Sequence, residues 1–443
     1  MKVAFVTDKF IIDPLGIAWL SSYLKEGGHE VSLHKPNSGN VPIDADMLCY
    51  SITTGKHTYY RDVNLALKAK NPGFISVFGG PHVTFFPEFA KEPGVDVAVR
   101  GEGFDAIVEI ANAVEKGDDY RSILNVVGDK RITAVRASKD KSTLLLPDRE
   151  LIYSDPENRD NPIKNVMASF YCPYNCKFCF NPAYKKLYGL LRSEIRPVNA
   201  VAEEIDQLRY YPLELIFFND DIFPVYDSEW LGEFCDYYSK VQVPFHIQLR
   251  VEYISDAVIS RLREVGLHGV TFAIESGNAK IRKSIGKSFP NERSTEAAEL
   301  LHKYGVKLRT ENMIGVPGES WETAMETLAV NTDCNPTIGW ASLFQPYPGT
   351  ELGDKCVQEG LFDGDLDSIS ESFFDTYRLK VPEAKKFEKL QKLFSLMVKY
   401  PRLQFLLPLL VRLPFRYKRL YSTIKKRLYK QLYKVAYNET TAL

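Results

Sequence analysis

The sequence predicts an α/β protein made of a doubly wound parallel sheet, a partial α/β barrel and a helical carboxyl-terminal tail. Short apolar segments alternate with helical ones over residues 1–135, and a second such series runs over residues 166–379. A charged, proline-bearing stretch, residues 136–165, separates the two series. Because parallel strands are usually joined by a crossover helix, each alternating series predicts a mostly parallel sheet.

Length and composition set the class of protein. The chain has 443 residues, of which 45% are hydrophobic and 26% charged, and this is enough for two or three globular domains. The formal net charge of -1 provides no overall attraction to nucleic acid, so we expect no such partner. The first residues, MKVAFVTDKF, have the pattern of a strand rather than of a signal peptide, which favours a cytoplasmic location. Seven cysteines, three of them clustered, favour metal binding over a disulfide framework.

The first series contains the strand-like segments KVAFVT, EVSLH, ADMLCYS, FISVFGG and VDVAVRGEG. In an open parallel sheet, ligands bind in the crevice at the carboxyl ends of the strands. The glycines at these ends allow a ligand to approach the backbone closely. The candidate binding residues are therefore those that follow the strands: Thr53, Thr54, Gly55, Gly79, Gly80, Pro81, His82, Gly101, Glu102 and Gly103.

The second series predicts six strands with intervening helices over residues 166–379. Six units are too few for a closed eight-stranded barrel, so a partial (β/α)6 barrel of the TIM type fits better. Residues 136–165 are expected to form a linker between the domains. Residues 380–443 are expected to form a helical, basic tail.

The segment YCPYNCKFCFNP contains Cys172, Cys176 and Cys179 in the spacing C-x3-C-x2-C. Structural zinc normally takes four ligands, and neither a fourth Cys nor a His lies near these three in the sequence. Three thiolates can instead bind three irons of a 4Fe-4S cluster and leave the fourth iron open to a substrate or cofactor. The spacing therefore predicts a 4Fe-4S cluster with a reactive iron.

This motif, with Phe178 before the last cysteine, resembles the signature of the radical SAM superfamily. The resemblance implies that S-adenosylmethionine chelates the open iron and is cleaved to a 5'-deoxyadenosyl radical. It also implies an external electron donor such as flavodoxin or ferredoxin. In such a site the cofactors carry the difficult chemistry and the protein orients them.

The resemblance extends to the strand ends that follow the cysteines. Asp220 and Asp221 end the second strand, where the family places polar groups on the methionyl amine. Arg250 ends the third, where its forked guanidinium suits the methionyl carboxylate, and Glu275 ends the fourth, at the ribose hydroxyls. The segment MIGVPGE, with Gly315 and Pro317, resembles the loop that holds adenine. The alternative for each acid is a structural cap or ion pair, and the order of these residues behind the cysteines favours the cofactor roles.

Residues 1–135 resemble the Rossmann-like, cobalamin-binding domain found ahead of many radical SAM cores. The resemblance implies that the glycine-rich strand ends hold cobalamin. The motif D-x-H-x-x-G, whose histidine ligates cobalt in many cobalamin proteins, does not occur in this sequence. His57 and Tyr59 are the side chains considered as replacement lower ligands, and a sheet without a ligand is the alternative for the domain.

The combined resemblance implies a cobalamin-dependent radical SAM C-methyltransferase. Such an enzyme transfers a methyl group from methylcobalamin to an unactivated carbon after the 5'-deoxyadenosyl radical has abstracted hydrogen. Two alternatives stay open: a cobalamin-dependent cyclase or rearrangement enzyme without net methylation, and a non-catalytic corrinoid-binding or redox-sensing protein. The sequence does not decide whether the substrate is a lipid, a peptide or protein side chain, or another small molecule.

The tail contains an apolar stretch followed by a basic one. Residues 403–415 are apolar but shorter than the ~20 residues that a membrane-spanning helix needs. After them, Leu420, Ile424, Leu428 and Leu432 recur at i, i+4 spacing among Lys and Arg, which predicts a basic amphipathic helix. The sequence leaves two alternatives open: peripheral contact with an anionic membrane or an acidic partner, and a helix packed on the core.

Overall fold

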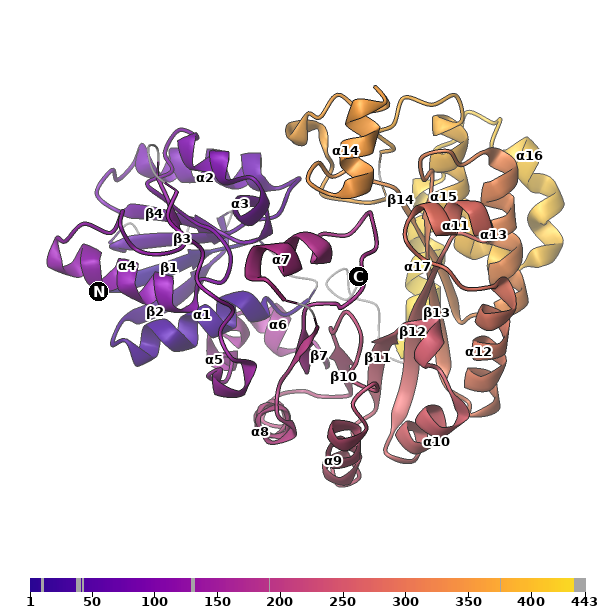
Figure 1. Ribbon diagram of the computed structural model, residues 1–443, viewed down its shortest axis with the longest axis horizontal. Helices are drawn as coiled ribbons and strands as arrows, with labels where there is room; N and C mark the ends of the chain where they lie inside the picture. Colours follow the sequence, from indigo (N-terminus) through magenta and orange to yellow (C-terminus); the bar gives the residue numbers. More distant parts are fainter. Residues whose placement is uncertain are drawn as a thin grey trace.

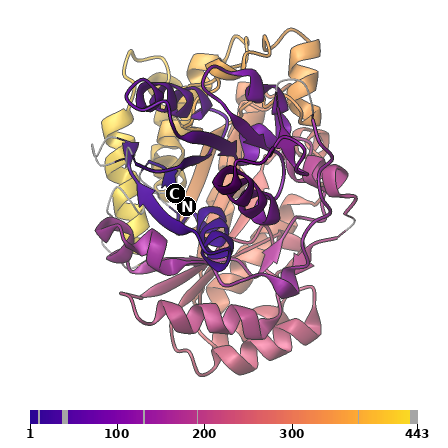
Figure 2. The same ribbon diagram turned by 90° about the vertical axis from the view of Figure 1, so that its left-hand side faces the viewer.

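The computed structural model describes residues 1–8, 12–36, 41, 44–128, 132–190, 192–374 and 376–433. Two parallel sheets lie side by side, the first in the indigo and purple domain at the left of Figure 1 and the second in the domain at the right. Turning the molecule by 90° brings the first domain to the front, and the second lies behind it (Figure 2). Residues 434–443 of the predicted tail lie outside the described residues.

The first sheet has six strands in the order β2-β1-β3-β4-β5-β6, and β6 is antiparallel to its neighbour. Alternate residues of each strand point to opposite faces: Val3 and Phe5 of β1 lie in one core, and Ala4 and Val6 lie in the other. Helices α1 and α4 cover the first face, while α2, α3 and η2 cover the second. The elements are β1 (Lys2–Val6), α1 (Leu15–Glu26), β2 (Glu30–His34), β3 (Met47–Ser51), α2 (His57–Lys68), β4 (Ile75–Gly79), α3 (Pro81–Phe85), η2 (Pro87–Lys91), β5 (Val97–Val99), α4 (Phe104–Lys116) and β6 (Val126–Val127).

The stretch predicted as a linker is packed into the structure. It forms η3 (Lys141–Thr143), α5 (Arg149–Tyr153) and α6 (Pro156–Arg159), and Arg149 is almost fully buried. The Arg149 guanidinium pairs with Asp13 of the first domain at 2.9 Å and with Glu204 of the second. The charge of Arg149 therefore lies in buried ion pairs that join the two domains, while Glu157, Arg159 and Asp160 of the same stretch are exposed.

The second sheet has six parallel strands in the order β14-β13-β12-β11-β10-β7, as expected for a partial barrel. Its first strand begins inside the predicted linker, and residues 169–170 belong to a separate two-stranded sheet. Helices α8, α9, α10 and α12 pack on the outer face through one continuous apolar core. The elements are β7 (Ile163–Val166), β8 (Ser169–Phe170), α7 (Asn181–Tyr188), β9 (Glu194–Ile195), α8 (Val198–Leu208), β10 (Leu215–Phe218), α9 (Ser228–Tyr238), β11 (Phe245–Leu249), η4 (Val251–Tyr253), α10 (Asp256–Glu264), β12 (Leu267–Glu275), α11 (Ala279–Ser284), α12 (Asn291–Lys303), β13 (Lys307–Ile314), α13 (Trp321–Cys334), β14 (Ile338–Leu343) and α14 (Glu351–Gln358).

The carboxyl-terminal elements follow α14, and two of the helices pack on the barrel sheet. They are η5 (Leu366–Ser368), α15 (Ala384–Lys399), η6 (Pro401–Leu406), α16 (Leu407–Leu410) and α17 (Lys418–Tyr433). Side chains of α15 cover the edge strand β14, because Ser395 and Gln391 donate hydrogen bonds to the carbonyls of Gly339 and Ala341. The apolar face of α17, including Leu428 and Leu432, packs with Phe217 of β10.

Part of the predicted apolar face of α17 packs on the core. Leu428 and Leu432 are buried there, whereas Leu420 is 40% exposed. Contact of the exposed Lys and Arg side chains of α17 with an anionic surface stays a prediction. Within the described ranges, none of the helices combines the length and apolarity needed to cross a membrane.

Candidate functional site

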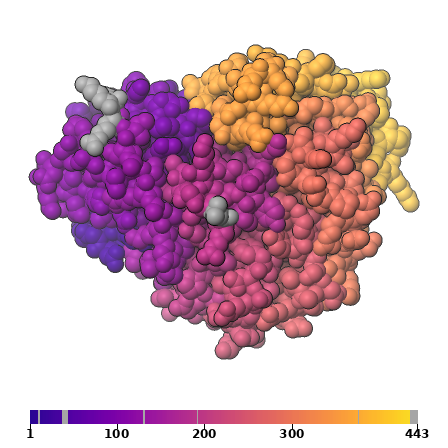
Figure 3. Space-filling model, viewed as in Figure 1, coloured from indigo at the N-terminus to yellow at the C-terminus, as the bar shows by residue number. Residues whose placement is uncertain are grey.

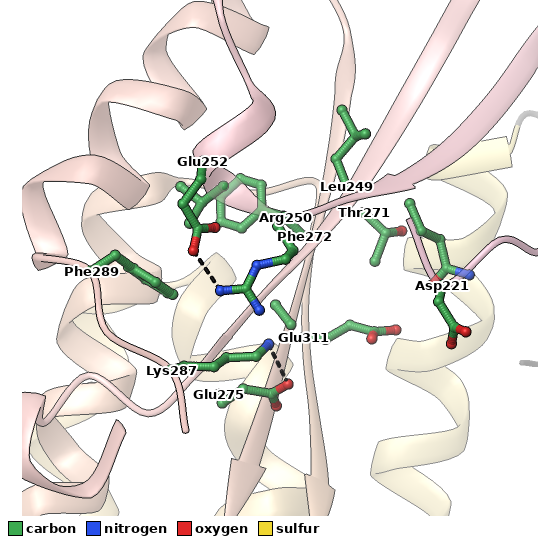
Figure 4. A pocket seen from close by; sticks show the side chains of 13 residues that line it. Asp221, Leu249, Arg250, Glu252, Thr271, Phe272, Glu275, Lys287, Phe289 and Glu311 are labelled. Atoms are coloured by element: carbon green, nitrogen blue, oxygen red, sulfur yellow. Dashed lines mark hydrogen bonds and ion pairs between the residues drawn. The ribbon is translucent and has the colours of Figure 1, made fainter. Parts of the chain in front are cut away.

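A polar cavity of about 210 Å³ lies at the carboxyl ends of β11 and β12 in the barrel (Figure 4). Its charged side chains are Asp221, Arg250, Glu252, Glu275, Lys287 and Glu311. The cavity is therefore rich in groups that bind a charged, hydroxylated ligand. Three residues named from the sequence, Asp221, Arg250 and Glu275, are brought together here although they come from three different strand ends.

Arg250 follows β11 and is held in one orientation from two sides. Its guanidinium carbon lies 3.7 Å from the centre of the Tyr174 ring, and its Nη2 pairs with Glu252. Its Nη1 lies 3.9 Å from the sulfur of Cys176. The arginine therefore stands between the cysteine loop and the cavity, where it can bind a carboxylate.

Glu275 ends β12 with a backbone conformation that is uncommon for a residue with a side chain. Its φ is 64°, and the pairing of β12 with β13 shifts register between Ala273 and Glu275. Such conformations cluster at binding sites, where the surrounding structure maintains them. The bulge aims the Glu275 carboxylate into the cavity, where it pairs with Lys287 at 2.8 Å (Figure 4).

The two aspartates after β10 have different surroundings. Asp220 is fully buried and accepts hydrogen bonds from the backbone and side chain of Ser169, so it braces β8 and does not line the cavity. Burial raises the pKa of Asp220 to about 7. Asp221 lines the cavity and is exposed. Of the pair, only Asp221 is in a position to contact a ligand there.

The three cysteines lie on the loop between β8 and α7. Burial raises the pKa of Cys172 and of Cys179 to about 11. Electrostatic repulsion from Asp221 and the other two cysteines also contributes to the raised pKa of Cys172. Asn181 Nδ2 lies 3.5 Å from the sulfur of Cys179. The three thiols are near enough to interact electrostatically with one another, and thiolates are the ligands of 4Fe-4S clusters. Among the described residues, no three His, Cys, Asp or Glu side chains are gathered around a single metal position, so the assignment of the cysteines to a cluster stays a prediction.

The remaining residues named for S-adenosylmethionine do not line the polar cavity. Phe178 is half-buried and packs against the core that contains Ile281. Gly315 has a φ of 84°, and a Cβ at this position would lie 2.2 Å from the Tyr377 ring. Its amide donates to the buried carboxyl of Glu319, whose pKa burial raises to about 8, while Pro317 is half-buried in the same loop.

A second cavity, of about 230 Å³, lies at the carboxyl ends of β1, β3, β4 and β5 in the first domain. Its walls are mainly apolar, and include Leu20, Tyr50 and Phe104. Six of the ten residues named for cobalamin line it: Gly79, Gly80, Pro81, Gly101, Glu102 and Gly103. Gly16 also lines it, and a Cβ there would meet nothing within 4 Å. An apolar cavity lined by glycines fits the nucleotide tail of cobalamin.

The other four residues lie outside this cavity. Thr53 and Gly55 belong to the loop after β3, and a Cβ on Gly55 would lie 2.7 Å from the backbone nitrogen of Glu371. Thr54 and His82 bond to each other at 3.0 Å, and burial lowers the pKa of His82 to about 3. This loop therefore packs against Glu371, which Lys56 also pairs with at 2.7 Å.

The two candidates for a lower cobalt ligand also lie outside the cavity. Nε2 of His57 bonds to Asp367 at 2.8 Å, and Nδ1 accepts the Gly55 amide at 3.2 Å. Both ring nitrogens are therefore already engaged. Tyr59 packs beside Tyr60 on α2, with ring centres 5.2 Å apart.

The cysteine loop touches both domains. The Tyr171 hydroxyl bonds to the carboxylate of Glu102, which also accepts from Lys141 Nζ at 2.6 Å. Phe180 stacks on Phe85 of α3 with ring centres 4.5 Å apart. The loop that carries the cysteines is therefore attached to the wall of the apolar cavity in the first domain and reaches the polar cavity of the barrel through Arg250.

Sequence reasoning missed several cavity residues. Gln248, Thr271 and Glu311 lie on strands β11, β12 and β13, and Lys287 follows α11. The first three share a signal, since each is a polar residue at an alternate position of a buried strand and such residues point into the barrel. No local pattern marks Lys287.

Comparisons with known proteins agree with this architecture. Residues 1–111 match the B12 binding domain, and residues 166–330 match the radical SAM superfamily. An uncharacterized methyltransferase of Pyrococcus horikoshii is 28% identical over 369 residues, which cover 79% of each chain. The anaerobic magnesium-protoporphyrin IX monomethyl ester cyclase of Rubrivivax gelatinosus is 26% identical over 379 residues, 77% of this chain and 66% of the cyclase.

Two solved structures share the fold at low sequence identity. The radical S-adenosylmethionine methyltransferase TsrM from Kitasatospora setae, with cobalamin and a 4Fe-4S cluster bound, superposes with a TM-score of 0.65 at 14% identity, over 81% of this chain and 75% of TsrM. The cobalamin-dependent S-adenosylmethionine radical enzyme OxsB, with aqua-cobalamin bound, superposes with a TM-score of 0.70 at 15% identity, over 97% of this chain and 71% of OxsB. In chain order, this protein combines a B12 binding domain, residues 1–111, with a radical SAM superfamily domain, residues 166–330, that carries the three cysteines.

Proposed function

We propose that this protein is a cobalamin-dependent radical SAM methyltransferase that transfers a methyl group to an unactivated carbon of its substrate. The observation that carries the proposal is the position of the cysteine loop. Tyr171 of this loop contacts Glu102 in the wall of the apolar cavity, and Cys176 lies beside Arg250 in the wall of the polar cavity. The methyl donor and the source of the radical would therefore meet at one place.

The residues of the chain bind and orient the cofactors. When bound, the cluster with S-adenosylmethionine supplies a 5'-deoxyadenosyl radical that removes hydrogen from the substrate, and cobalamin supplies the methyl group. We assign Cys172, Cys176 and Cys179 to three irons. Arg250 binds the methionyl carboxylate, because its guanidinium is already oriented by Tyr174 and Glu252.

The remaining contacts to S-adenosylmethionine come from two acids of the polar cavity. Asp221 binds the methionyl amine, since it lies close enough to Cys172 and Cys179 for its charge to raise the pKa of both thiols. Glu275 accepts the ribose hydroxyls, since the β12 bulge aims its carboxylate into the cavity. An external one-electron donor such as flavodoxin or ferredoxin reduces the cluster.

One anaerobic experiment tests the reaction class. The protein is reconstituted with iron, sulfide and hydroxocobalamin, and then receives reductant and methyl-labelled S-adenosylmethionine. We expect formation of 5'-deoxyadenosine together with transfer of the label to cobalamin. Deoxyadenosine without labelled cobalamin contradicts the methyltransferase, and absence of deoxyadenosine contradicts any radical SAM activity.

A second candidate is a cyclase that uses the same cofactors without net methylation. The Rubrivivax gelatinosus cyclase favours it, because its identity of 26% is close to the 28% of the Pyrococcus horikoshii methyltransferase. Once a substrate is known, the mass of the product separates the two. A gain of one labelled methyl group supports the methyltransferase, and a product that carries no label supports the cyclase.

A further inference from the structure

Exposed apolar side chains gather in the segment between α15 and α17, residues 400–415. Five of its apolar side chains are exposed: Tyr400, Leu403, Phe405, Leu409 and Phe415. The exposed fraction of Phe405 is 77%. Leu407 and Val411 of the same segment are buried and attach it to the barrel core. Single exposed apolar residues are ordinary, but five in sixteen residues of one anchored segment indicate a surface that binds something.

Along the chain, the residues within this segment and just before and after it carry only positive charges. From Lys389 to Tyr433 the sequence contains twelve Lys or Arg residues and no Asp or Glu. Arg402, Arg412 and Arg416 lie within or next to the apolar segment and are exposed. Apolar side chains bordered by cations are the pattern of proteins that bind anionic lipid surfaces.

The segment lies at the end of the molecule that is farthest from the cobalamin domain. In Figure 1, α16 is at the right-hand edge while the first domain is at the left. The yellow carboxyl-terminal residues form the right-hand rim of the space-filling view (Figure 3). A flat surface can approach this end without touching the first domain.

We propose that residues 400–415 dock this protein on the surface of an anionic lipid bilayer. Phe405, Leu409 and Phe415 enter the interface between headgroups and acyl chains, and the neighbouring arginines bind lipid phosphates. The docking is peripheral, and it uses a different part of the tail from the amphipathic helix that the sequence suggested, because α17 packs part of its apolar face on the core. The inference does not depend on the reaction that the protein catalyses.

Vesicle co-sedimentation of the cofactor-loaded protein tests the proposal. We expect binding to vesicles of phosphatidylcholine with phosphatidylglycerol, weaker binding to phosphatidylcholine alone, and a loss of affinity as salt rises. The variant Phe405→Ser/Leu409→Ser/Phe415→Ser should bind anionic vesicles at least about tenfold more weakly, which corresponds to about 1.4 kcal/mol. Arg412→Gln/Arg416→Gln should weaken binding to anionic vesicles and leave binding to neutral ones unchanged.

Tyr210→Ser is the matched control, since Tyr210 is an 87% exposed aromatic residue of the barrel outside this segment. It should bind vesicles like the unmodified protein, and the cobalamin absorbance of each variant verifies folding. Three outcomes overturn the proposal. They are no binding to anionic vesicles at low salt, equal binding by the triple serine variant, and self-association in solution that the triple variant abolishes, which would make a second copy the occupant.

Discussion

The two cavities occupy equivalent places in two parallel sheets, yet their walls differ in chemistry. Both lie at the carboxyl ends of strands and have similar volumes, about 230 Å³ in the first domain and about 210 Å³ in the barrel. The first is lined by glycines and apolar side chains, and the second by charged ones. The topology of a parallel sheet thus determines where a ligand binds, and the residues at the strand ends determine which ligand.

The largest effect should come from removing the cluster. This change would disable the site in the barrel and leave the apolar cavity of the first domain intact. We expect Cys176→Ala to abolish formation of 5'-deoxyadenosine, because the cluster loses one of its three protein ligands. Cobalamin binding should persist. Iron content, the absorbance of reconstituted protein and deoxyadenosine yield measure the effect. Cys235→Ala, at a buried cysteine of α9, is the control and should keep the cluster.

Filling the apolar cavity of the first domain should impair cobalamin binding and leave the cluster in place. Gly16→Leu places a side chain in the cavity without a backbone clash, since a Cβ there meets nothing within 4 Å. We expect cobalamin affinity to fall at least about tenfold while the cluster assembles normally. Gly16→Ala adds only the Cβ and should stay close to the unmodified protein. If both variants bind cobalamin equally well, the ligand does not occupy this cavity.

A milder change in the polar cavity tests the role of its arginine. Arg250→Lys keeps the charge but loses the forked guanidinium that stacks on Tyr174. We expect S-adenosylmethionine to bind about ten- to a hundredfold more weakly, the value of a charged hydrogen bond, and cobalamin binding to stay unchanged. Equilibrium binding to the reconstituted protein measures this. Arg209→Lys, at an exposed ion pair with Asp206, should have no effect.

The contact between the domains links the two sites, and weakening it should affect both slightly. Glu102→Gln removes the carboxylate that holds Tyr171 and pairs with the buried Lys141. We expect a loss of roughly 1–3 kcal/mol in the free energy of unfolding. Tyr171→Phe should lose less, because Lys141 keeps its partner. Denaturant unfolding compares them, and an unchanged midpoint in Glu102→Gln would mean that this contact does not join the domains.

The last prediction is a change of stability with pH that comes from a single carboxyl outside both cavities. The pKa of Asp220 is about 7 in the folded protein, against 3.8 as its ordinary value. Between these values the folded state binds more protons than the unfolded state, so the free energy of unfolding falls as pH rises, by up to about 1.4 kcal/mol per pH unit. Asp220→Asn should remove this slope in urea unfolding of the apoprotein from pH 4 to pH 7. An identical slope in the variant would contradict the assignment.

Two neighbouring residues show which features of the site could be predicted from the sequence and which could not. The sequence predicted that Asp220 and Asp221 end a barrel strand, and both follow β10 within three residues, because strand ends follow from a local apolar run. The two side chains then diverge: Asp220 turns to Ser169, fifty-one residues away, and Asp221 lines the cavity. In the same way the sequence offered His57 as a candidate lower cobalt ligand, but its ring bonds to Asp367, 310 residues distant.

What the sequence by itself determined is local in the chain. The spacing of Cys172, Cys176 and Cys179, the glycines after the first strands and the alternation of strands with helices are patterns within a few residues, and they predicted the cofactors and both sheets. Only the tertiary structure decided that α17 packs inside the barrel, that the predicted linker carries buried ion pairs and that the cysteine loop joins the two cavities. These features arise from contacts between distant segments, whose energies depend on shape and burial that no local pattern encodes.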